Sequence, residues 1–98
     1  MSTKAFLYFD STTGYQEIFQ LLEKRLKRQG SIIIHSHLLD DYNEFEIETN
    51  AFKIVYELIQ QHRITITFSD DSMIQKTVGI IESALGKNTK ITRIEYDD

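Results

Sequence analysis

Two short segments in which polar and apolar residues alternate strictly restrict the fold of this chain more than any other feature. Residues 44–48 place three glutamates on one side of the chain and Phe45 and Ile47 on the other. Residues 63–68 likewise alternate isoleucine and phenylalanine with threonine. Since successive side chains of a strand point to opposite faces, each segment is predicted to be a half-buried β-strand. The chain therefore needs a sheet with one apolar and one polar face.

Three other segments carry apolar residues at helical spacing, and each predicts an amphipathic helix. The apolar stripes, in chain order, are Tyr15, Ile18, Phe19, Leu22 and Leu26; Ala51, Phe52, Val55, Leu58 and Ile59; and Ile74, Val78, Ile81 and Leu85. Before the first helix, Thr13 and Gln16 have the spacing of a capping box. Gly30 and Gly86 follow the first and third stripes, where glycine commonly ends a helix.

The remaining predicted elements are strands, which complete an α+β chain. Residues 4–10, 31–39 and 89–96 are rich in aromatic or β-branched residues, the last segment least clearly. The predicted order is β-α-β-β-α-β-α, with an extra strand at the C-terminal end. Because all three helices must bury their stripes on one sheet, we expect an open-faced sandwich. The antiparallel hairpin over residues 31–48 excludes a purely doubly wound sheet.

Length and composition limit the classes of protein to which the chain can belong. Its 98 residues suffice for a single domain with one core, taken as residues 1–98. The 15 acidic and 11 basic residues give a net charge of −4, whereas nucleic-acid-binding modules usually need a basic face. There is no cysteine for disulfides or thiolate chemistry, and no apolar stretch approaches a membrane span. We expect a cytoplasmic protein that binds neither nucleic acid nor membrane.

The order and lengths of these elements resemble those of the HPr family, the phosphocarriers of the bacterial sugar phosphotransferase system. The resemblance covers residues 4–85. Residues 49–54 are similar to the segment in which HPr proteins begin their second helix, with Thr49 or Asn50 as its cap. Asp70 and Asp71 are similar to the acidic start of the family's last helix. The resemblance implies an HPr-like fold, and a ferredoxin-like fold with the same β-α-β-β-α-β order is the alternative.

The chain departs from the family at both of its phosphorylation sites. HPr proteins that carry phosphate place a histidine, followed by an arginine and a proline, in the loop before the first helix. Here residues 11–17 contain none of the three. The family's regulatory serine is matched by Asn50, which cannot be phosphorylated. The resemblance therefore implies a fold without phosphocarrier chemistry.

The same resemblance implies a surface for a protein partner. HPr proteins dock on partner enzymes through the starts of their first two helices. The matching residues here are Tyr15, Phe19, Asn50, Ala51 and Phe52. Aromatic residues near the centre of an interface often carry much of its energy. The alternative reading is that Phe19 and Phe52 belong to the hydrophobic core.

Two further groups of residues are candidates for binding small ions. Ser11, Thr12, Thr13 and Gly14 offer hydroxyls and amides at a helix start, which is a candidate anion site, but plain helix capping is the favoured explanation. His35 and His37 lie two apart and so share one face of a strand. With a third ligand from Asp40, Asp41 or His62 they would hold a metal ion. The alternative is that both histidines are simply exposed polar residues.

The sequence therefore predicts a non-catalytic, HPr-like protein-interaction or regulatory module that does not carry phosphate. We expect it to be no enzyme, to need no cofactor and to bind a protein partner, with a second copy of the chain as one candidate. One alternative is a small acidic inhibitor, of the kind that immunity proteins represent, which binds a basic partner. The other is a ferredoxin-like domain that binds a metal or a small ligand.

Overall fold

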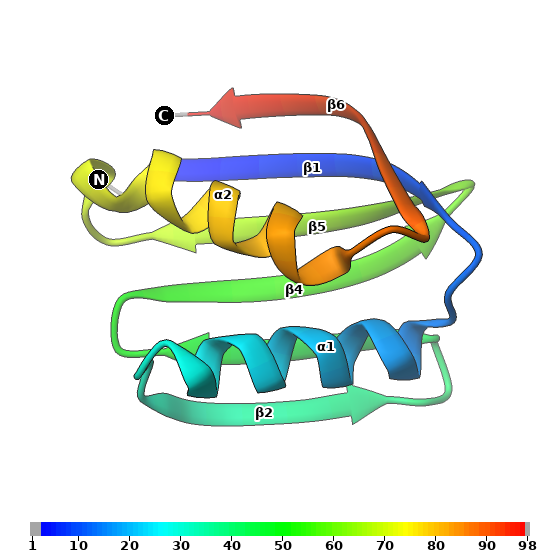
Figure 1. Cartoon of the computed structure of the whole chain (residues 1–98), viewed down its shortest axis with the longest axis horizontal. Coiled ribbons are helices and arrows are strands. Elements are labelled where there is room, and N and C mark those ends of the chain that lie inside the picture. The colour runs from blue at the N-terminus through cyan, green and yellow to red at the C-terminus, as the bar shows by residue number, and fades with distance from the viewer. Residues whose placement is uncertain (1–2, 98) are drawn as a thin grey trace.

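The computed structural model describes residues 3–97 as one antiparallel sheet with both helices on the same face (Figure 1). The elements are β1 (Thr3–Ser11), α1 (Tyr15–Arg28), β2 (Ile33–Leu39), β3 (Glu44–Thr49), β4 (Phe52–Ile59), β5 (Gln61–Phe68), the 3-10 turn η1 (Asp71–Met73), α2 (Ile74–Leu85) and β6 (Thr89–Asp97). The six strands lie in the order β2-β3-β4-β5-β1-β6. The expected α+β architecture, with helices on one face of a single sheet, is confirmed at this level.

Four consecutive strands of the sheet pair as hairpins, and the first and last strands of the chain are added beside the fourth of them. Strands β2 to β5 pair in chain order, and every pair is antiparallel. Strand β1 then lies between β5 and β6, with Lys4 opposite Asp97 at one end. The strand at the C-terminal end, predicted least clearly, is thus present and forms one edge of the sheet. Strand β2 forms the other edge.

The alternating segments place their apolar residues in the core, as predicted. In β3, Phe45 and Ile47 are fully buried, and the same holds for Ile64 and Ile66 in β5. The apolar stripes of α1 and α2 pack against this face of the sheet. Their buried residues are Ile18, Phe19, Leu22 and Leu26 in α1, and Val78, Ile81 and Leu85 in α2. Glu44, Glu46 and Glu48 alternate with the buried residues and so point to the opposite, open face. No helix of residues 3–97 covers that face (Figure 1).

The predicted second helix is wrong, because its residues form strand β4. The buried side chains of this segment follow a period of two, and Ile54 and Tyr56 are fully buried. The Tyr56 ring stacks on Phe45 of β3, with 4.9 Å between the ring centroids. Thr49 accepts hydrogen bonds from the amides of Ala51 and Phe52 in a tight turn between two strands, and so caps no helix. The element order is β-α-β-β-β-β-α-β, which differs from the predicted HPr-like order and from its ferredoxin-like alternative.

The ends of the two observed helices agree in part with the sequence signals. Gly30 and Gly86 adopt φ angles of +82° and +76°, which glycine tolerates, just beyond α1 and α2. The predicted capping box is wrong: Gly14 is the N-cap of α1, and no side chain caps it. Thr13 is buried, and the Gln16 side chain donates to the Tyr15 hydroxyl. Helix α1 is therefore held mainly by its buried stripe.

Candidate functional site

The partner-binding surface predicted from the helix starts is divided between two ends of the molecule. Tyr15 begins α1, and its hydroxyl donates to Asp40 Oδ1 at 2.6 Å in the turn between β2 and β3. This hydrogen bond raises the pKa of Tyr15. Asn50 lies at the opposite end of β3, where its backbone N–H donates to the backbone carbonyl of Ile32 at 3.3 Å. Figure 1 shows α1 running between these two ends, so Tyr15 and Asn50 do not share a surface.

The two phenylalanines of that predicted surface have different environments. Phe19 is only 8% exposed and meets Phe45 edge to face, with 5.2 Å between the ring centroids, so it belongs to the core. Phe52 is half-buried beside Ala51 and packs against Phe68 across the β4–β5 pair, at 6.3 Å. The core alternative therefore holds for Phe19.

The hydroxyl groups before α1 join two loops of the protein. The Ser11 hydroxyl accepts hydrogen bonds from the Thr13 amide at 3.0 Å and from the Thr89 hydroxyl at 3.2 Å. The backbone N–H of Thr12 donates to the backbone carbonyl of Asn88 at 3.3 Å. These contacts tie the loop before α1, which ends at Gly14, to the loop before β6. They account for the hydroxyls structurally, and anion binding there stays a prediction.

The histidine pair gains a neighbour that the sequence reasoning did not name. His35 and His37 lie side by side on β2, with 4.4 Å between the ring centroids. The third acidic or imidazole group in the cluster is Glu46 of β3. His62 is remote from them on β5, where its Nδ1 lies 2.6 Å from the Tyr56 hydroxyl. Only the hairpin register, which sets His37 opposite Glu46, could have identified this neighbour.

The open face also carries a hollow that the sequence did not predict. Its volume is about 480 Å³. It lies over β1, β4, β5 and β6 and is lined by Tyr8, Asp10, Glu57, Ile59, Gln60, Gln61, Arg63 and Arg93. The Arg63 guanidinium is 2.7 Å from Glu57 Oε1, and this hydrogen bond raises the pKa of Arg63. That arginine is therefore already occupied by a carboxylate of its own chain.

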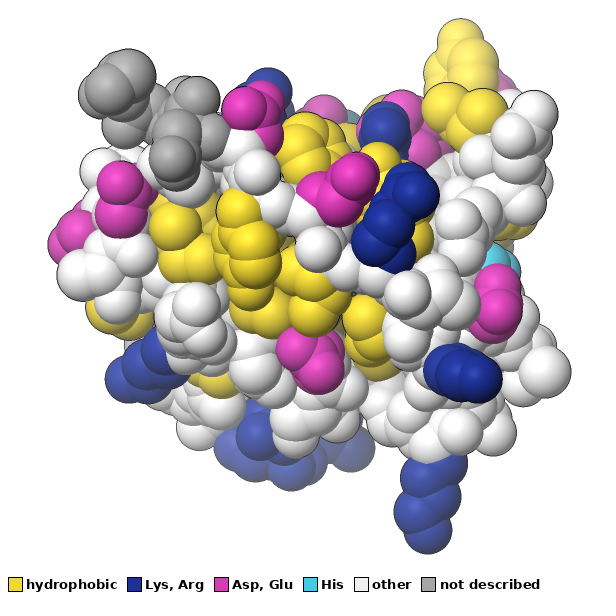
Figure 2. Space-filling view, turned by 90° about the horizontal axis from the view of Figure 1, so that it is seen from above, with side chains coloured by type: hydrophobic (Ala, Val, Ile, Leu, Met, Phe, Trp, Pro, Cys, Tyr) yellow, Lys and Arg dark blue, Asp and Glu magenta, His cyan; other side chains and the backbone are white. Residues whose placement is uncertain are grey.

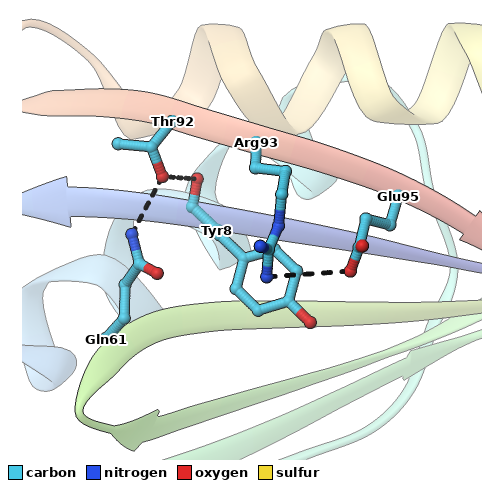
Figure 3. Close-up of polar contacts among 5 residues, drawn as sticks. All are labelled: Tyr8, Gln61, Thr92, Arg93 and Glu95. Atoms are coloured by element: carbon cyan, nitrogen blue, oxygen red, sulfur yellow. Dashed lines mark hydrogen bonds and ion pairs between the residues drawn. The ribbon is translucent and has the colours of Figure 1, made fainter.

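Arg93 is held differently, because an aromatic ring rather than a close carboxylate positions it. Its guanidinium lies over the Tyr8 ring, 4.1 Å from the centroid, an arrangement that favours a cation electrostatically. Glu95 approaches it at 3.8 Å, and the Arg93 side chain is 58% exposed. Figure 3 shows this group together with Thr92, which donates to the Tyr8 carbonyl at 3.1 Å and accepts from Gln61 at 2.9 Å. Arg93 thus keeps exposed hydrogen-bond donors on a fixed support.

Strand β6 forms the edge of the sheet beside this hollow. Its Ile91, Ile94 and Tyr96 pair with buried residues of β1 and therefore lie on the helix side. Arg93 and Glu95 pair with Tyr8 and Phe6 and lie on the open side. Figure 2 looks onto this edge and shows a band of hydrophobic side chains with charged side chains beside it. The edge therefore offers apolar and charged rows on opposite sides of one backbone.

Comparisons with known proteins add no family to this description. No protein-family model matches the chain, and no curated protein sequence matches it. Neither helix within residues 3–97 is long and apolar enough to cross a membrane.

Proposed function

We propose that this chain is a non-catalytic protein-interaction module that does not carry phosphate and that binds its partner along the free edge of β6. One observation carries this role: β6 is a nine-residue edge strand with no strand on its outer side among residues 3–97. An unpaired row of backbone N–H and C=O groups is a template for another strand. This role does not depend on a relationship to HPr proteins, because the second helix used in that resemblance is β4.

Most devices that keep an edge strand from pairing are missing from β6. Proteins block such edges with short strands, prolines, bulges, charged side chains along the edge or charges that point toward the core side. Strand β6 is nine residues long, contains no proline and has no charge on the helix side, although Lys90, Arg93 and Glu95 lie on its open side. It has one irregularity, at Thr92 between Ile91 and Arg93, so regular pairing is available from Arg93 onward.

The charges on β6 specify what a partner strand should contain. Directly opposite residues of an antiparallel pair lie on the same face, where opposite charges attract and like charges repel. A partner strand therefore needs an acidic residue across from Arg93, an apolar residue across from Ile94 and a basic residue across from Glu95. Read along the antiparallel partner, that order is basic, apolar, acidic.

The chain's own segment Arg93-Ile94-Glu95 has this order. A second copy that pairs with Ile94 opposite Ile94 would therefore set Arg93 of each copy against Glu95 of the other. The pairing is isologous, as twofold symmetry requires. Because this segment is complementary to itself in the antiparallel direction, we assign a second copy of the chain as the partner that pairs with β6.

Sedimentation velocity over a range of protein concentrations tests this role directly. We expect the wild-type chain to shift from monomer to dimer as concentration rises, and Arg93→Glu to shift the transition to higher concentration. Lys24→Glu is the matched control, because it makes the same charge change on the exposed surface of α1 and should leave the transition in place. A wild-type chain that stays monomeric at every concentration would reject a second copy as the partner.

A second candidate role, as a small acidic inhibitor of a basic protein, is favoured by the turn between β2 and β3. Tyr42 is 71% exposed there, beside the exposed carboxylates of Asp40 and Asp41. An aromatic ring within an acidic rim suits a basic partner surface. Affinity capture compared between the wild type and an Asp40→Asn, Asp41→Asn double variant tests it. Retention of the same captured basic protein by the double variant would count against this role.

A further inference from the structure

We propose that His35, His37 and Glu46 form a binding site for a divalent transition-metal ion, with Zn²⁺ as the natural probe. One ligand atom from each side chain lies within 4.8 Å of the other two. His37 Nε2 lies 3.8 Å from Glu46 Oε2. The site lies on the open face at the β2 edge, away from the β6 edge, and goes beyond the proposed interaction role.

The three ligand atoms, all within 4.8 Å of one another, lie slightly farther apart than in a zinc site. Zinc bonds of about 2.0–2.2 Å to nitrogen or oxygen in a tetrahedral arrangement set the ligand atoms roughly 3.3 Å apart. The His37–Glu46 distance of 3.8 Å exceeds that value only slightly. Since His35 is exposed and the other two are half-exposed, rotations about their side-chain bonds can close the remaining distance.

Strand geometry, rather than a flexible loop, fixes the three ligands. His35 and His37 are two residues apart on β2 and therefore point to the same face. Antiparallel pairing sets His37 directly opposite Glu46 of β3, so the third ligand comes from the neighbouring strand on that face. Binding would cross-link the edge strand to the rest of the sheet.

The donor set selects the class of metal ion. Two imidazole nitrogens and one carboxylate oxygen suit zinc, cobalt, nickel or copper, whereas magnesium and calcium prefer ligand sets made only of oxygen. Three protein ligands leave a fourth position for water or for Glu48, which lies opposite His35. The chemical class of the ligand is therefore a borderline or soft divalent cation.

One neighbouring cation competes for the carboxylate. Lys53 Nζ lies 4.0 Å from Glu46 Oε1 and would repel an incoming metal ion. The Lys53 side chain is 44% exposed, so it can turn toward solvent. An exposed ion pair at this distance contributes little stability, and its loss is a small obstacle. We therefore expect Lys53→Gln to strengthen metal binding.

Calorimetric titration of the untagged chain with Zn²⁺ tests the site, and Co²⁺ absorption reports the coordination geometry. We expect one ion per chain, a tetrahedral Co²⁺ spectrum and a higher melting temperature with zinc. His37→Gln and Glu46→Gln should each weaken binding by about tenfold or more.

Glu44→Gln is the matched control, since it removes the same charge from the same face of β3, two residues away. It should leave zinc affinity unchanged. Absence of zinc binding in the wild type would overturn the site. So would equal losses in Glu44→Gln and Glu46→Gln, because the effect would then be one of general charge. Circular dichroism of each variant establishes that the fold is retained.

Discussion

The most specific prediction concerns charge exchange across the paired β6 edges. If Ile94 faces Ile94 in the dimer, Arg93 of one copy lies across from Glu95 of the other, and symmetry makes this contact twice. Arg93→Glu then replaces two attractive contacts with two repulsive ones. Glu95→Arg does the same with the opposite sign.

The size of the effect follows from the exposure of these side chains. The Arg93 and Glu95 side chains are 58% and 51% exposed, so each attractive contact contributes about 0.2–1 kcal/mol and each repulsive contact costs a similar amount. Four such changes sum to about 2 kcal/mol, which corresponds to roughly a 30-fold weaker dimer. Because the contacts are exposed, the effect should shrink as salt is added.

Mixing the two variants separates this arrangement from a general charge effect. A copy with Glu at both positions and a copy with Arg at both positions are complementary, so the equimolar mixture of Arg93→Glu and Glu95→Arg should form heterodimers. The double variant exchanges both charges and should regain the self-association of the wild type. Sedimentation velocity at equal total concentration measures all four samples. A mixture that associates no better than its components would refute the predicted register.

Three further predictions test the core and the absence of phosphate transfer. Phe19→Ala should lower the free energy of unfolding by about 3–5 kcal/mol in urea titrations, because the ring is buried against Phe45, and should leave association at β6 unchanged in the folded fraction. Burial lowers the pKa of His62 below its ordinary value of 6.5, despite the opposing charge of Asp10, so the unfolded chain binds a proton more readily. The contribution of His62 to the free energy of unfolding should therefore be complete above pH 6.5 and decrease as the pH falls below that value. His62→Gln should flatten this pH dependence of the melting temperature. Incubation with phosphoenolpyruvate and Enzyme I, or with HPr kinase, should leave the intact mass unchanged, and a stable phosphoprotein would refute the non-carrier role.

Local patterns predicted most of the elements, and the one failure has a physical cause. The segment that forms β4 contains apolar residues that satisfy both a helical stripe and a strand alternation. Its β-branched and aromatic residues Phe52, Ile54, Val55 and Tyr56 favour the strand, and burial of Tyr56 against Phe45 decides in its favour. A helix there would have left β3 and β5, whose apolar faces are buried, without the strand that lies between them.

The candidate sites differ in how far they could be predicted without knowing how the strands pair. The pairing of His35 with His37 is local and was predictable from their spacing alone. Their relation to Glu46 requires the register of the β2–β3 hairpin. The contact between Tyr8 and Arg93 joins the first and last strands, and no local pattern in either segment indicates it.

The two proposed sites should act independently, because the sheet keeps them apart. Glu46 lies on β3 and Arg93 on β6, and three strands separate β3 from β6. Four steps of about 4.8 Å place them roughly 19 Å apart, about twice the distance over which physiological salt screens exposed charges. Arg93→Glu should therefore leave zinc affinity unchanged, and Glu46→Gln should leave the dimer unchanged. A variant at one site that altered binding at the other would mean that the sheet deforms as a unit, since direct electrostatic coupling over this distance is too weak.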